Sequence, residues 1–203
     1  MRSFRPHLLA PALSAFALTG CGNGEGGTPT AATAATAAAE ETAAPIAEWG
    51  WETRASDDFP REDGFAYLVG VRAARHGDAA AHPAFDRVVL ELDGDAPSWR
   101  VAFEEPPIVE DPTGLTIDVE GEAFLRVSLH PASGLDASGD EPVARYDGPD
   151  RIPVDGHVVT EVVLVTDHDG ALAWVVGLAR QAPFAVSLLA DPPRLVVDVV
   201  DDG

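Results

Sequence analysis

The sequence contains no lysine and only one cysteine, Cys21, among 203 residues. One cysteine cannot form a disulfide within the chain, so a folded domain has to be stabilised by its apolar core alone. All 13 basic residues are arginines, and 34 acidic residues bring the formal net charge to -21. Because so acidic a chain repels phosphates and is not attracted to anionic lipid, we expect no nucleic acid partner.

Common catalytic motifs are also missing. The chain has no Gly-x-Ser-x-Gly elbow, no Ser-x-x-Lys pair and no His-Glu-x-x-His helix, so we expect a protein that is not an enzyme and uses no cofactor. Paired carboxylates occur at Asp147–Asp150 and Asp167–Gly170. Neither segment continues into a calcium-loop ligand series, and Asp169-Gly170 is typical of a hairpin turn, so we expect no metal site.

The one apolar run near the start, residues 8–18, is too short to cross ~30 Å of hydrocarbon as a helix. It follows Arg2 and Arg5, which is the layout of a secretory signal peptide, and we expect residues 1–20 to be removed. Leu18-Thr19-Gly20-Cys21 resembles the bacterial lipobox, whose cysteine receives diacylglycerol; a chance cysteine after an ordinary signal peptide is the alternative. We predict lipidation of Cys21 and an anchor on the extracytoplasmic face of the bacterial cell membrane.

Residues 21–63 are expected to lead from this anchor to the folded domain. Residues 22–47 are mainly Gly, Thr, Ala and Glu without large apolar side chains, which predicts a solvated tether. Residues 49–63 are rich in turn-forming residues and form an entry segment. We place the domain at residues 64–203.

Alternating apolar and polar residues run through that domain, and no segment has a helical period. The pattern predicts an all-β fold, a single β-sandwich of about eight mostly antiparallel strands. A short strand around Ile117 and Val119 is also predicted, and residues 131–153 are expected to be irregular. The predicted strands are Phe65–Arg72, Phe85–Asp93, Ser98–Glu104, Ala123–His130, Val158–Thr166, Ala171–Leu178 and the two runs of Ala182–Val200.

The last of these runs form a hairpin around Asp191-Pro192-Pro193-Arg194, because proline cannot donate to a β-ladder. After this turn, Leu195, Val197 and Val199 are predicted to face the core, and the alternate positions face outward.

This hairpin sequence, with Trp174–Leu178 and Phe85–Leu92, resembles the AMIN-like domain of bacterial surface lipoproteins. That group is similar to the AMIN domains that localise cell-wall amidases and secretins. The resemblance implies a domain that binds peptidoglycan or a cell-wall protein. The alternative is a hydrolase of envelope glycans or its accessory subunit, which would need a carboxylate pair such as Glu104 and Asp150.

Arginines that the alternation places on the outward faces of strands are the main candidates for binding. These arginines either pair with carboxylates on neighbouring strands or bind the carboxylates of a ligand, as a peptide stem or a uronic-type glycan would present them. Exposed aromatic rings could stack on sugars, or they could close the end of the sandwich. The candidate residues are Arg87, Arg100, Arg126, Arg194, Asp198 and Tyr146, with Trp49 and Trp51 as further aromatic candidates.

The lipidation hypothesis is tested by Cys21→Ala. Because the modification needs the thiol itself, we expect the variant to stay unlipidated and to lose stable membrane association. Cell fractionation measures this, with the unmodified chain as the control. Equal membrane retention of the variant would contradict the predicted anchor.

Overall fold

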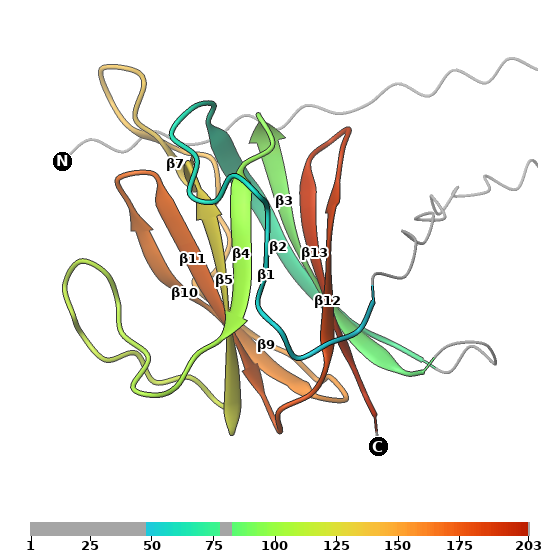
Figure 1. The fold of residues 1–203 in the computed structure, drawn as a ribbon. Coiled ribbons are helices and arrows are strands. Elements are labelled where there is room, and N and C mark those ends of the chain that lie inside the picture. Colours follow the sequence, from blue (N-terminus) through green and yellow to red (C-terminus); the bar gives the residue numbers. More distant parts are fainter. Residues whose placement is uncertain (1–47, 78–82, 203) are drawn as a thin grey trace, which may run out of the picture. The chain divides into compact units, whose positions relative to one another are not determined.

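The computed structural model describes residues 48–77 and 83–202, and their regular structure consists of β-strands (Figure 1). The predicted signal peptide, Cys21 and the tether lie outside the described residues. Within the described part of the chain, no helix is long and apolar enough to cross a membrane.

Eight strands of six or more residues carry the fold, as predicted. They are β2 (Ala66–His76), β3 (Phe85–Gly94), β4 (Ser98–Phe103), β5 (Ala123–His130), β10 (Val159–His168), β11 (Ala171–Leu178), β12 (Phe184–Leu189) and β13 (Arg194–Val200). Five further strands have two or three residues. They are β1 (Arg54–Ala55), β6 (Ala132–Ser133), β7 (Leu135–Asp136), β8 (Val143–Ala144) and β9 (Arg151–Pro153).

These strands form two main sheets, which Figure 1 shows as two layers. The six-stranded sheet has the order β1-β4-β5-β11-β10-β9, and the five-stranded sheet has the order β12-β13-β3-β2-β6. Among the strands of residues 48–77 and 83–202, only β6 pairs in parallel, with β2. The all-β prediction is therefore confirmed, and the pairing is mostly antiparallel.

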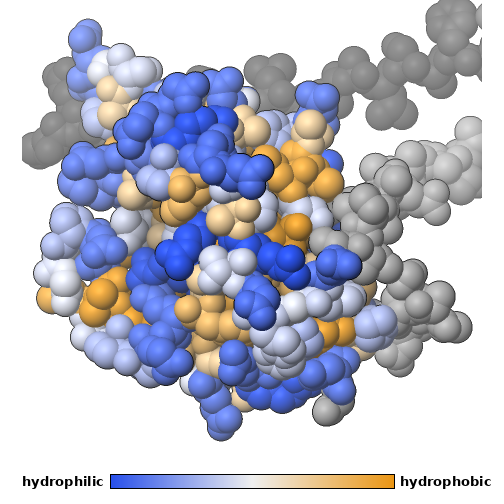
Figure 2. Space-filling model, in the orientation of Figure 1, coloured by the Kyte–Doolittle hydropathy of each residue, from blue (hydrophilic) through white to orange (hydrophobic). Residues whose placement is uncertain are grey.

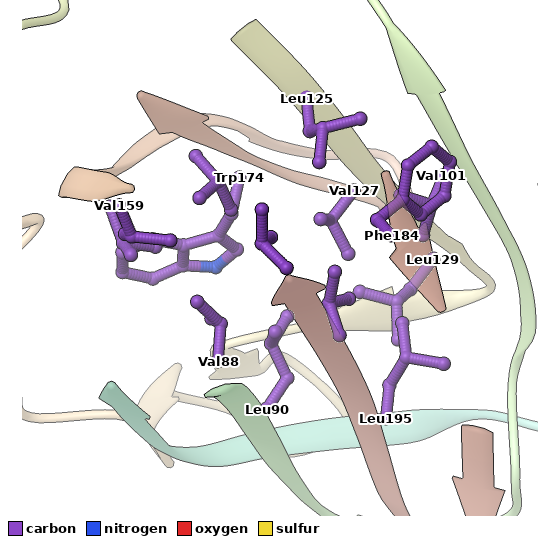
Figure 3. Packing of buried hydrophobic residues seen from close by; sticks show 14 of the residues in the cluster. Val88, Leu90, Val101, Leu125, Val127, Leu129, Val159, Trp174, Phe184 and Leu195 are labelled. Carbon is purple, nitrogen blue, oxygen red and sulfur yellow. The ribbon is translucent and has the colours of Figure 1, made fainter. Parts of the chain in front are cut away.

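The apolar faces of the two sheets meet in one buried core (Figure 3). Leu125, Val127 and Trp174 point inward from the six-stranded sheet, and Val88 and Leu90 face them from the five-stranded sheet. Alternation along each strand places every second side chain in this layer. The predicted core face of the last strand, Leu195, Val197 and Val199, is confirmed, since all three side chains are fully buried.

The hairpin between β10 and β11 follows from its turn residues. His168 pairs with Ala171, which leaves Asp169 and Gly170 as a two-residue turn. Both have positive φ angles, 48° and 77°. A turn of this kind matches the twist of the flanking strands and favours Asp-Gly, so the predicted hairpin is confirmed.

Two local predictions are wrong. Ile117 and Val119 do not form a strand; the nearest pairing is an isolated bridge between Val109 and Thr116, because this loop packs its apolar side chains on the outer face of a sheet. Residues 131–153 are not irregular throughout, since they contain the four short strands β6 to β9. Strands of two or three residues are too short to show an alternating pattern.

The carboxylate of Asp86 joins the two sheets. Asp86 lies on β3 and is only 1% exposed, and it accepts backbone N–H bonds from the segment that enters β10 of the other sheet. Oδ1 accepts from His157 at 2.9 Å, and Oδ2 accepts from Val158 at 2.7 Å and Val159 at 2.8 Å. One side chain thus satisfies three backbone donors that would otherwise be unpaired in the interior.

We expect Asp86→Asn to destabilise the domain by about 2–3 kcal/mol. The amide group replaces one acceptor oxygen with a donor, so at least one buried N–H loses its partner. Urea denaturation followed by circular dichroism measures the change. The control is Asp155→Asn, the same change at an exposed neighbour. Equal stability of the two variants would contradict the structural role of Asp86.

Candidate binding groove

The loop between β4 and β5, residues 104–122, covers part of the outer face of the six-stranded sheet (Figure 1). Its apolar side chains Ile108, Ile117 and Val119 pack on outward residues of that sheet, among them Val163 and Val175. The outer face therefore carries a second, smaller core.

Backbone contacts fix the position of this loop. Arg126 Nη2 donates to the Val109 carbonyl at 3.0 Å, and Arg151 Nη2 donates to the Asp118 carbonyl at 2.6 Å. A Cβ atom at Gly177 would overlap the Glu120 carbonyl oxygen, so the close approach of loop and strand requires glycine there.

Next to this loop, the outer face holds two adjacent hollows that we call the outer groove. The larger, about 360 Å³, is lined by Phe59 and Pro60 of the entry segment and by Val109 and Asp111 of the loop. The smaller, about 190 Å³, is lined by Arg100, Ala102, Phe103, Glu104, Arg126 and Ser128. Glu104, Arg126 and Ser128 line both hollows, so the two hollows lie next to each other.

A row of four residues across the sheet follows this groove. Arg100 on β4 pairs with Ser128 on β5, Ser128 with Ala173 on β11, and Ala173 with Thr166 on β10. Directly opposed residues point to the same face, so all four face outward. Arg100 and Thr166, at the two ends of the row, are three strand spacings apart, a distance of about 14 Å.

The charge of Arg126 is neutralised inside the groove. Its Nε donates to Glu104 Oε2 at 2.7 Å, and its Nη2 donates to Glu104 Oε1 at 3.0 Å. This bidentate pair is largely shielded from solvent, with side chains 19% and 22% exposed. Because an arginine has five N–H donors, the two on Nη1 are left without an acceptor among the described residues.

Besides Nη1 of Arg126, further polar groups along the groove have no partner among the described residues. They include the guanidinium of Arg100, the carboxylate of Asp111 and the hydroxyl of Thr166, whose Oγ1 is buried in a residue only 6% exposed. A buried hydroxyl without a hydrogen bond costs about 1–3 kcal/mol. The groove therefore offers unused polar groups beside apolar walls, as ligand sites commonly do.

The predicted arginine face is divided between the two sheets. Arg87 on β3 pairs with Asp198 on β13, with bonds of 2.7 Å from Nε and 2.8 Å from Nη2. Arg194 lies opposite Glu91 on the same sheet, and its buried Nε has no hydrogen-bond partner among the described residues. Only Arg100 and Arg126 lie in the outer groove.

The aromatic candidates lie elsewhere. Tyr146 packs edge-on against Trp174 at 5.6 Å, and its hydroxyl donates to the Pro149 carbonyl. Burial raises the pKa of the Tyr146 phenol, and the nearby carboxylates of Asp150 and Asp147 add to this effect. Trp49 packs near Phe85, with ring centres 6.1 Å apart.

Trp51 is 49% exposed and stacks on Phe103. Neither hollow of the outer groove is lined by Trp51.

Glu104 and Asp150 are not brought together. Glu104 follows β4 and Asp150 precedes β9, and β5, β11 and β10 lie between these strands. Four strand spacings amount to about 19 Å, wider than the ~6.5–9.5 Å between the paired carboxyl groups of inverting glycosidases. Among the residues that the structure describes, no group of three or more His, Cys, Asp or Glu side chains could hold a metal ion.

The family model for the AMIN-like domain matches residues 66–201. This chain belongs to the AMIN-like domain family. The resemblance found in the sequence is thereby confirmed, and membership points to an envelope-associated, peptidoglycan-related role. No curated protein and no solved structure matches the chain. In this AMIN-like protein, Phe59 and Pro60 line the groove but come before residue 66, where the match to the family model begins.

Of the residues that line the groove, the sequence indicated Arg100 and Arg126 as binding candidates and Glu104 as half of a carboxylate pair, and the other parts were missed. Ser128 and Thr166 could have been found by aligning the outward positions of neighbouring strands, but this needs the strand order. The walls had no signal, since Phe59 and Val109 lie in segments without alternation.

The geometry predicts different roles for two similar arginine pairs. Arg126→Gln removes the bond to the Val109 carbonyl, so we expect faster amide hydrogen exchange in residues 108–117. Arg87→Gln removes an equally bidentate pair on the other sheet, with side chains 14% and 18% exposed.

We expect each variant to lose about 1–3 kcal/mol of stability. Hydrogen exchange with mass spectrometry distinguishes them. Equal exchange of residues 108–117 in both variants would contradict the proposed fixing of the loop by Arg126.

Proposed function

We propose that this AMIN-like protein is a lipoprotein anchored through Cys21 to the extracytoplasmic face of the bacterial cell membrane. Its β-sandwich binds a cell-envelope component, peptidoglycan or a cell-wall protein, and catalyses no reaction. Family membership and the lipobox-like sequence support the location. The outer groove, with its unpaired Arg100, is the observation that carries the binding role.

A binding role fits the chemistry of the groove better than a catalytic one. Both carboxylate oxygens of Glu104 accept hydrogen bonds from Arg126, which orient this side chain toward the arginine rather than toward a substrate. Asp150, the partner suggested for Glu104 in the hydrolase alternative, also lies too far away to form such a pair.

The surface is also suited to a protein that remains soluble at the end of a tether. Figure 2 shows hydrophilic residues over most of the visible face, with hydrophobic residues in small separate patches. Such a surface favours contact through a defined site rather than through a broad apolar face.

Arg100→Gln should weaken binding to purified cell-wall sacculi about tenfold, because it removes the one groove cation that no described carboxylate neutralises. The melting temperature should hardly change, since this guanidinium is exposed. The matched control is Arg75→Gln, which removes an exposed guanidinium from the other sheet.

A sacculus pull-down at low and high salt measures the effect, beside a turnover assay on the same material. Binding should fall as salt rises, because exposed charges are screened. Unchanged binding of Arg100→Gln would contradict the groove as the site, and turnover of the sacculi would contradict a purely binding role.

A further inference from the structure

The outer groove has the dimensions of a short extended chain. The row from Arg100 to Thr166 spans about 14 Å, and an extended peptide advances about 3.4 Å per residue. Four residues of such a peptide therefore cover the row. Ala173 in the middle of the row has a small side chain, and Phe59 and Val109 also line this part of the groove.

Charge in the groove is separated into two places. Arg100 lines the smaller hollow only, and Asp111 lines the larger hollow only. Between them the charge of Arg126 is cancelled by Glu104. The groove is thus complementary to a ligand with one carboxylate, one ammonium group and a neutral polar part between them.

The neutral middle part has hydrogen-bonding groups suited to amides. Arg126 Nη1 keeps two N–H donors for carbonyl oxygens, and the hydroxyl of Ser128, which lines both hollows, can donate or accept. A peptide backbone supplies both kinds of partner at regular spacing.

A glycan strand matches the groove less well. The exposed ring of Trp51, on which a sugar could stack, lies outside both hollows. A uronic-type glycan carries a carboxylate on each repeating unit. The acidic protein repels these carboxylates, apart from the one that would lie beside Arg100.

We infer that the outer groove binds a short zwitterionic peptide segment, with its carboxylate at Arg100 and its ammonium group at Asp111. This inference rests on the proposed function and names the part of the envelope material that is recognised. It assigns the contact to peptide rather than to glycan.

The test uses the purified full-length protein and a defined probe, the tetrapeptide Lys-Ala-Ala-Ala with an acetylated N-terminus, a free lysine ammonium group and a free C-terminal carboxylate. NMR titration measures its Kd, together with that of the C-terminal amide, the acetyl-lysine form and the neutral glycan chitotetraose. In the unmodified protein we expect amidation to raise the Kd about tenfold and lysine acetylation about fivefold.

Two variants test which protein side chain contacts each charge of the peptide. In Arg100→Gln, amidation of the peptide should change the Kd less than about twofold, while lysine acetylation should still weaken binding. In Asp111→Asn, lysine acetylation should change the Kd less than about twofold, while amidation should still weaken binding. Both side chains are exposed, so folding should be retained. Arg75→Gln, on the other sheet, should keep both effects.

Three outcomes would overturn the inference. They are tighter binding of chitotetraose than of the tetrapeptide, no binding of the tetrapeptide by a protein that still binds sacculi, and an amidation effect that persists in Arg100→Gln. The proposed function fails separately, if sacculi are not bound while the tetrapeptide is.

Discussion

The apolar layer between the two sheets determines where every other side chain of the sandwich lies. Along each strand alternate residues enter this layer, so the remaining residues face outward whatever their chemistry. Trp174 and Leu195 illustrate the inward set, and Arg100 and Ser128 the outward set. The pattern that stabilises the fold therefore also builds the row from Arg100 to Thr166 on the outer face. Asp86 ties the two layers together by accepting three backbone bonds across them.

Arginine pairs serve different purposes on the two outer faces. On the five-stranded sheet Arg87 and Asp198 neutralise each other across adjacent strands, as charged neighbours on a sheet commonly do. On the six-stranded sheet Arg126 also fixes a loop, because one of its nitrogens reaches the Val109 carbonyl. That loop supplies one wall of the outer groove. A residue type that looks uniform in the sequence thus stabilises one face and shapes the outer groove on the other.

Much of the architecture could be predicted because its determinants are local. The eight long strands show alternation over six or more residues, and the Asp169-Gly170 turn has the backbone angles that favour this dipeptide. The failures have physical reasons as well. Strands such as β7 and β8 have two residues, too few for a period, and the loop 104–122 is ordered by packing on a sheet rather than by its own pattern.

Composition and short motifs by themselves determined the acidic character, the all-β class, the predicted lipidation of Cys21 and the outward direction of Arg100 and Arg126. These follow from charge, from nearby residues and from a period of two. Only the tertiary structure decided which arginines share a face, which already have a carboxylate partner, and where loop and entry segment leave a groove. Such properties depend on the order of the strands in each sheet. Strand order brings residues that are far apart in the sequence, such as Arg100 and Thr166, into one row, and no local sequence pattern encodes this order.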